Sequence, residues 1–163
     1  MEQTGETILI SVFDRESYEI VYVDSVESQN PIRYTVPVGT RRPLYCTSSG
    51  RIFLAHSDEA YIGSYLKHHR FEKLTARTMT SAKELRASME AIRKQGFSYS
   101  VGEFSLEVVG AAAPIFEQGR SLNAVLSLAA PASRARDRIE HFAKLVAEGA
   151  RVISGGNHFQ PLK

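Results

Sequence analysis

The stretch "VVGAAAPIFEQGRSLNAVLSLAAP", Val108–Pro131, decides the class of fold that this sequence can adopt. Two segments rich in apolar and β-branched residues, Val108–Phe116 and Leu122–Pro131, flank the short polar sequence "EQGR". This arrangement is typical of a β-hairpin, and Gly119 supplies the permissive backbone that a tight turn needs. We therefore expect two antiparallel strands in this part of the chain.

The region before this hairpin contains four more segments that we predict as strands. Thr7–Asp14 is rich in β-branched and aromatic residues, and Glu19–Glu27 follows closely enough to form a second hairpin with it. Beyond the turn signal "SQNP", polar and apolar residues alternate over Ile32–Val36, which predicts a third strand. The short segment "FSYS", Phe97–Ser100, predicts one more strand directly ahead of the central hairpin.

Helices are predicted between these strands and at the end of the chain. Four segments combine cap residues or helical periodicity: 48–56, 57–69, 81–96 and about 135–154. The clearest is the third, in which Ser81 and Glu84 form a capping box and Gly96 ends the helix. Strand hairpins on both sides of inserted helices predict an α+β fold, with a curved, mainly antiparallel six-stranded sheet and flanking helices. Such a sheet can leave a cavity between its concave face and the helices.

Composition and charge restrict the class of protein. The chain has 163 residues, 43% of them apolar and 23% charged, as in an ordinary globular domain, and we expect one domain over residues 1–163. The net charge is +2 and the 20 basic residues are scattered, which argues against a nucleic-acid-binding surface in this chain alone. The sequence has no apolar run of membrane-spanning length and no secretory signal, so we expect a cytoplasmic protein.

The single cysteine and the five histidines are the candidates for nucleophilic or metal chemistry. One cysteine excludes an internal disulfide and a cysteine-cluster metal site. Cys46 could act as a nucleophile only with a histidine close in space, and no local signature surrounds it, so we expect a packed residue. His68 and His69 would point about 100° apart on a helix, which disfavours binding of one ion by both. We therefore expect no catalytic residue, no metal and no cofactor.

Two acidic residues, Glu103 and Glu107, lie in the predicted loop between "FSYS" and the central hairpin. Carboxylates at such positions can transfer protons only where their spacing and burial suit the reaction. We favour surface groups, or acceptors of hydrogen bonds from a ligand, over general acids and bases.

The turn "CTSSGR" joins a loop to the first predicted helix. The N–H groups at a helix start are unpaired and carry the positive end of the helix dipole, and small residues let a ligand approach them closely. A carboxylate would bind well at such a turn, whereas the spacing of a phosphate-binding P-loop is absent. The alternative is plain capping by Thr47 or Ser48 with tight packing against the sheet. Both interpretations remain open on the sequence of the turn alone.

Three segments together resemble the effector-binding domain of IclR-type bacterial transcription regulators. They are "VGTRRPLYCTSSGRIFLAH", "LTARTMTSAKELRASMEAIRKQGFSYSVGEF" and "AAAPIFEQGRSLNAVLSLAAPASR", and the resemblance extends from about Thr7 to Ile153. It implies a GAF-like sheet and helices, and a sensor for a small organic acid that modulates DNA binding by a homodimer or homotetramer. In that family a winged helix-turn-helix domain contacts operator DNA, and we expect this chain to be the C-terminal domain without it.

The resemblance also implies a set of effector-binding residues. In the family, backbone N–H groups at the turn that corresponds to Ser48, Ser49 and Gly50 hold the ligand carboxylate. Tyr34 falls at an apolar wall of the family's pocket, and Ser127 falls where a serine often faces the ligand.

The sequence departs from the family pattern opposite that turn. Ser100 replaces an acidic residue, Gly110 replaces a cysteine, and Glu107 stands where a glycine is usual. Smaller and uncharged partners leave more room and remove a repulsive charge. We therefore favour a larger or flatter effector, such as an aromatic acid, over a two- or three-carbon keto acid.

Two alternatives belong to other functional classes. The first is a GAF-like enzyme that uses Cys46, which requires a histidine within hydrogen-bond reach. The second is a ligand-free dimerisation module, in which the small residues of "GAAAP" and "CTSSG" simply fill the core. A cavity between the sheet and the helices would favour the sensor over the second alternative.

Overall fold

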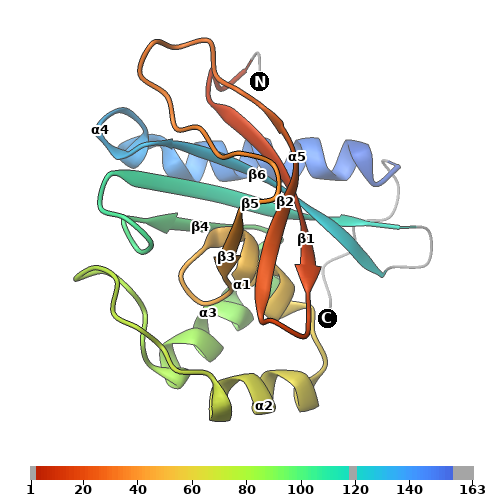
Figure 1. The fold of residues 1–163 in the computed structure, drawn as a ribbon. Coiled ribbons are helices and arrows are strands. Elements are labelled where there is room, and N and C mark those ends of the chain that lie inside the picture. Colours follow the sequence, from red (N-terminus) through yellow and green to blue (C-terminus); the bar gives the residue numbers. More distant parts are fainter. Residues whose placement is uncertain (1–2, 118–120, 156–163) are drawn as a thin grey trace.

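The computed structural model describes residues 3–117 and 121–155, in which one curved antiparallel sheet carries helices on both faces (Figure 1). The strands are β1 (Thr7–Asp14), β2 (Glu19–Val26), β3 (Arg41–Pro43), β4 (Ser98–Val101), β5 (Val108–Phe116) and β6 (Leu122–Pro131). Their order in the six-stranded sheet is β3-β2-β1-β6-β5-β4, so the first and last strands of the sequence pair at its centre. The predicted α+β class and six-stranded antiparallel sheet are confirmed.

The helices are α1 (Ser48–Ala55), α2 (Glu59–His68), α3 (Ala82–Gln95), α4 (Ala132–Ala135) and α5 (Ile139–Ile153). Local capping explains where the first three begin. The side chains of Thr47, Asp58 and Ser81 accept hydrogen bonds from the backbone three residues further along, at 3.1, 2.8 and 3.5 Å. Gly96 ends α3 in the left-handed conformation with a φ of 81°, as predicted.

Two separate apolar clusters pack on the two faces of the sheet. Helix α5 covers β5 and β6 on one face, and α1 with α3 lies on the other (Figure 1). Residues alternate between the faces, as the pleat of a strand requires. Along β6, Leu126 and Leu128 join the α5 cluster, whereas Val125 and Ala129 join the α1 cluster. The intervening Ser127 therefore faces α1, as does Gly110 on β5.

The predicted strand at Ile32–Val36 is wrong. Residues 27–40 form no strand, and the third strand is the shorter segment Arg41–Pro43, which pairs with β2. The alternation in this stretch has another physical cause, because Tyr34 and Val36 turn inward and pack against the α1 cluster while their neighbours stay exposed. Pro31 and Pro37 bracket the stretch, and proline cannot donate to a strand ladder.

The structure also bears on the predicted last helix and on the central hairpin. The last long helix begins at Ile139 and not at Ala135, because α4 and a 3-10 turn (Arg136–Arg138) precede it. The predicted central hairpin is confirmed by the pairing of β5 with β6, but Gly119 in its turn lies outside the described residues. Among the helices that the structure describes, none is both long and apolar enough to cross a membrane.

Candidate ligand-binding site

A cavity of about 50 Å³ lies between the α1-covered face of the sheet and the start of α1. Six of the seven residues that the sequence analysis assigned to a pocket line it: Tyr34, Ser48, Ser49, Ser100, Gly110 and Ser127. They come from the 27–40 segment, α1, β4, β5 and β6, so the fold brings together residues that are up to 93 positions apart in the sequence (from Tyr34 to Ser127).

Gly50 is the predicted pocket residue that does not line this cavity. Its N–H group donates to the Thr47 hydroxyl at 3.1 Å, which caps α1. A Cβ atom at this position would lie 2.4 Å from the backbone of Leu44, so only glycine lets the helix start approach so closely. Gly50 therefore shapes the turn, and its N–H group is already used inside the protein.

The two preceding N–H groups differ from that of Gly50. In the described part of the chain, neither the Ser48 N–H nor the Ser49 N–H has a hydrogen-bond partner. Both belong to the first turn of α1, where the helix dipole is positive, and this turn contains no acidic residue. Thr47 therefore caps the helix, which was one interpretation of the turn. Binding of a carboxylate by the Ser48 and Ser49 N–H groups, which have no partner within the described residues, stays a prediction.

Gly110 sits where two serine hydroxyls converge. It pairs with Ser100 across β4 and β5, and a Cβ atom on Gly110 would lie 3.0 Å from Ser48 Oγ and 3.2 Å from Ser100 Oγ. Neither hydroxyl makes a hydrogen bond within the described residues. The absence of a side chain at Gly110 thus keeps a small polar space open between α1 and the sheet.

A buried ion pair joins α1 to the segment that follows β4, and both of these elements contribute residues to the cavity. Arg51, on α1, donates through Nη1 to the Glu103 carboxylate and through Nη2 to the Tyr99 carbonyl, the latter at 2.6 Å. Both charged side chains are buried. Burial raises the pKa of Glu103, and the Arg51 guanidinium acts in the opposite direction. The pair holds the start of α1 against the end of β4, which is a structural role for Glu103.

The remaining candidates from the sequence do not assemble into a reactive centre. Cys46 is fully buried in the cavity wall, and burial raises the pKa of its thiol to about 12, so it stays protonated. The Glu107 side chain and His68 are exposed, and His69 stacks on Tyr65 at 4.7 Å between ring centroids. Among residues 3–117 and 121–155, no group of three His, Cys, Asp or Glu side chains could hold a metal ion.

Several residues that line the cavity were not assigned to a pocket from the sequence, and three of them have large polar or aromatic side chains. Tyr22 on β2, Arg42 on β3 and Phe104 after β4 all contribute to its wall. Burial raises the pKa of Tyr22 to about 12, while the Arg42 charge and the Ser49 hydroxyl act in the opposite direction. No local signal in the sequence marked Arg42 as inward-facing, because the third strand was predicted at Ile32–Val36 and not at Arg41–Pro43.

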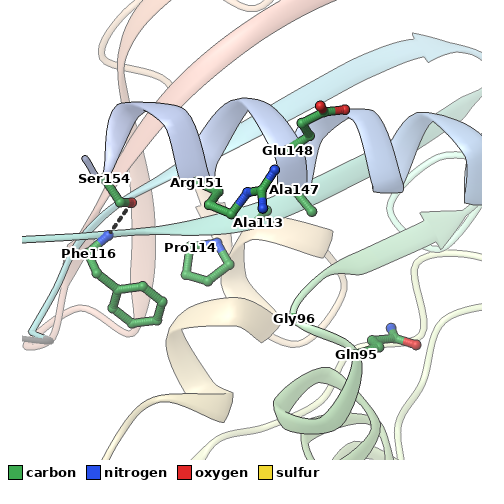
Figure 2. Close-up of a pocket in the computed structure, with 9 residues that line it drawn as sticks. All are labelled: Gln95, Gly96, Ala113, Pro114, Phe116, Ala147, Glu148, Arg151 and Ser154. Atoms are coloured by element: carbon green, nitrogen blue, oxygen red, sulfur yellow. Dashed lines mark hydrogen bonds between the residues drawn. The ribbon is translucent and has the colours of Figure 1, made fainter. Parts of the chain in front are cut away.

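A second, wider pocket of about 340 Å³ lies away from the first cavity, between α5 and the end of α3 (Figure 2). It is bounded by α5, by β5 and by the end of α3, and Phe116 N–H donates to Ser154 Oγ at 3.0 Å along its edge. Glu148 and Arg151 on α5 supply its charged groups. None of the predicted pocket residues lines it.

Comparisons with known proteins identify the family of this chain. The family model "Bacterial transcriptional regulator IclR C-terminal" matches residues 1–155. The transcriptional repressor IclR of Escherichia coli is 29% identical over 155 residues, 94% of this chain and 57% of that protein. The regulator KdgR of E. coli is 30% identical over 161 residues, 97% of this chain and 60% of that protein.

A solved structure agrees with these matches, and the resemblance seen in the sequence is confirmed. The crystal structure of the Thermotoga maritima IclR superposes with a TM-score of 0.86 at 29% identity, covering 98% of this chain and 64% of that one. This chain therefore spans somewhat more than half of the relatives that it matches. It belongs to the IclR C-terminal family of bacterial transcriptional regulators.

Proposed function

We propose that this domain binds a small organic acid in the cavity beside α1, and that binding changes how the full-length regulator engages operator DNA. The observation that carries the proposal is that the N–H groups of Ser48 and Ser49, at a helix start in the wall of the cavity, have no hydrogen-bond partner among the described residues. A carboxylate placed there accepts two backbone hydrogen bonds and meets the positive end of the α1 dipole.

The side chains around these donors support an acid as the ligand. The hydroxyls of Ser48 and Ser100 have no protein partner among the described residues, so they are available to a ligand oxygen. No aspartate or glutamate belongs to the described wall of the cavity, so no negative charge repels a carboxylate. A carboxylate bound here would accept hydrogen bonds from these hydroxyls.

The size of the effector remains a prediction. A cavity of about 50 Å³ holds a few water molecules or a short acid, whereas an aromatic ring needs roughly three times that space. The 27–40 segment, whose Tyr34 and Val36 line the cavity, has no strand ladder to hold it along most of its length. An aromatic acid would bind if this segment moved outward, and a short acid would bind without such movement.

The effect on DNA is the second half of the proposal. An effector changes operator binding only if its affinity differs between two arrangements of the regulator. The segment from Tyr34 to Cys46, which includes β3, contributes several groups to the cavity and is followed by α1, so closing around an acid would shift both. We expect a homodimer or homotetramer to transmit this shift, with operator DNA contacted by a winged helix-turn-helix domain preceding this one.

Calorimetry with this domain tests the proposal. Glyoxylate, pyruvate, butyrate, succinate, benzoate and phthalate cover short, long and aromatic acids, and we expect at least one to bind and to raise the melting temperature. Ser49→Leu should abolish this binding, because its side chain would enter the cavity beside the free N–H groups. Ser64→Leu, on the exposed side of α2, is the matched control and should bind as wild type.

The proposal makes two outcomes decisive. If Ser49→Leu bound the acid as tightly as the Ser64→Leu control, the acid would occupy a different pocket. If no acid in the series bound the wild-type domain, the alternative of a ligand-free dimerisation module would be favoured. Analytical ultracentrifugation of the same samples would then show whether the domain associates without a ligand.

A further inference from the structure

Two adjacent arginines on β3 have different surroundings. Neighbouring residues of a strand point to opposite faces, so Arg41 and Arg42 cannot share an environment. Arg41 is exposed and donates to Asp14 at 2.8 Å and to Glu19 at 3.1 Å. Arg42 is partly buried and lines the cavity beside α1. The outward arginine is thus neutralised by two carboxylates, and the inward one reaches the candidate site.

Arg42 is held in position without being neutralised. Its guanidinium lies 4.6 Å from the centroid of the Phe104 ring, and its Nη1 donates to the Arg41 carbonyl at 2.8 Å. In the parts of the chain that the structure describes, Arg42 forms no ion pair with a carboxylate. A guanidinium stacked on an aromatic ring keeps its other N–H groups in a defined plane, which suits bidentate binding of a carboxylate.

The charge of Arg42 acts on two ionisable groups that line the cavity. It acts to lower the pKa of the Tyr22 hydroxyl and of the Cys46 thiol, although burial dominates and raises the pKa of each to about 12. Both groups therefore remain neutral at physiological pH. Arg42 is the one charged residue among those that line the described cavity, and nothing in the wall compensates it.

We propose that Arg42 is a second anchor for the effector, and that the preferred ligand is consequently a dicarboxylic acid. One carboxylate accepts hydrogen bonds from the Ser48 and Ser49 N–H groups, and the other accepts hydrogen bonds from the guanidinium of Arg42. This inference rests on the proposed function, because it says which residue binds the second carboxylate of the same ligand. A monocarboxylic acid would satisfy the helix start and leave the Arg42 charge unpaired in a partly desolvated site.

Matched pairs of ligands test this inference on the wild-type domain. Butyrate and succinate share a four-carbon chain, and benzoate and phthalate share a ring, so each pair differs by one carboxylate. We expect the dicarboxylate to bind about 10- to 100-fold more tightly than its partner in at least one pair, as a charge-assisted bidentate contact predicts. Raising the salt concentration should reduce this preference.

Three variants locate the preference. Arg42→Met retains an apolar contact with Phe104 but removes the charge, so it should lose the preference and bind the two members of each pair with equal affinity. Arg42→Lys keeps the charge without the planar fork, so it should restore part of the preference. Arg41→Met, which changes the outward neighbour, is the control and should preserve the preference.

The outcomes separate this inference from the proposed function. One outcome is that acids bind the wild type, that Ser49→Leu abolishes this binding, and that the two members of each pair bind equally. In that case Arg42 would not be an anchor, and the proposed function would stand. If Arg42→Met left a dicarboxylate preference unchanged, another residue would be its source. If no acid bound the wild type, both proposals would be overturned. Circular dichroism of each variant identifies any loss of folding, and the wild-type comparison decides the question without a variant.

Discussion

The face of the sheet that α5 covers and the face that α1 covers bury different kinds of side chain. The α5 cluster consists of alanine, valine, leucine, isoleucine and phenylalanine. The α1 side buries, beside its apolar cluster, the polar groups of Ser48, Ser49, Ser127 and the Arg51–Glu103 pair. Burying polar groups costs free energy unless each has a partner. The α1 side, which buries more of these groups, is the side where we propose that a ligand binds.

The largest expected effect lies on the α5 side. Phe142 is 1% exposed at the centre of the α5 cluster, and Phe142→Ala should lower the free energy of unfolding by about 3–5 kcal/mol. Acid binding by the folded fraction should be unchanged, because the side chain does not touch the cavity. Urea denaturation and calorimetry measure the two quantities. Val152→Ala, on an exposed part of the same helix, is the control and should change stability by less than about 0.5 kcal/mol.

The second effect concerns the ion pair on the α1 side. Glu103→Leu leaves the buried Arg51 guanidinium without its carboxylate and should lower the free energy of unfolding by about 3 kcal/mol. Replacing both partners, as Arg51→Met with Glu103→Leu, should recover much of this loss, because no charge is then left unpaired. A double variant as unstable as Glu103→Leu would contradict this account. Glu107→Leu, at an exposed neighbour, is the single-site control.

The third effect separates stability from recognition most directly. Gly110→Ala places a methyl group 3.0 Å from Ser48 Oγ and 3.2 Å from Ser100 Oγ, in the space between the two hydroxyls. We expect it to weaken acid binding at least about tenfold while lowering the free energy of unfolding by about 1 kcal/mol or less, since a hydroxyl can rotate away. Calorimetry and urea denaturation give both values. Unchanged affinity would show that the ligand does not approach Gly110.

The smallest effect concerns Asp14, the last residue of β1. The hydrogen bond from Arg41, and then those from Ser17, lower the pKa of Asp14 from 3.8 to about 2. Because folding favours the ionised form, Asp14 stabilises the protein above pH 3.8, and this contribution is lost as the pH falls toward about 2. Asp14→Asn should therefore flatten the acid limb of a stability–pH profile. Asp137→Asn, also exposed, should retain the wild-type profile.

Much of the fold could be predicted from local patterns. The bounds of β1, β5 and β6 follow from runs of strand-forming residues, and α3 begins at Ser81 and ends at Gly96 as its caps predict. The third strand could not be predicted in the same way. Alternation at Tyr34 and Val36 reflects packing against helices that come later in the sequence, whereas β3 has three residues and no periodicity to reveal it.

The candidate site was predictable in part, and mainly through the family resemblance. Ser48, Ser49 and Ser127 stand at positions that the family motifs mark, and they line the cavity. Gly50 carries the same motif but serves the packing of α1 on Leu44. Arg42 escaped prediction because an arginine next to an arginine normally indicates a solvated surface, and only the pleat of β3 directs the second one inward.

The sequence by itself determined the elements whose signals are local: hairpins with turn residues between apolar runs, and helices with caps three residues from the groups they satisfy. Tertiary structure alone decided which face of "GAAA" in β5 meets α1, because both faces of that strand are buried and its residues are nearly alike. It also decided that Arg42, Ser48, Ser100 and Gly110 share one cavity. Those contacts form only when strands far apart in the chain close into one sheet, and no local pattern records that closure.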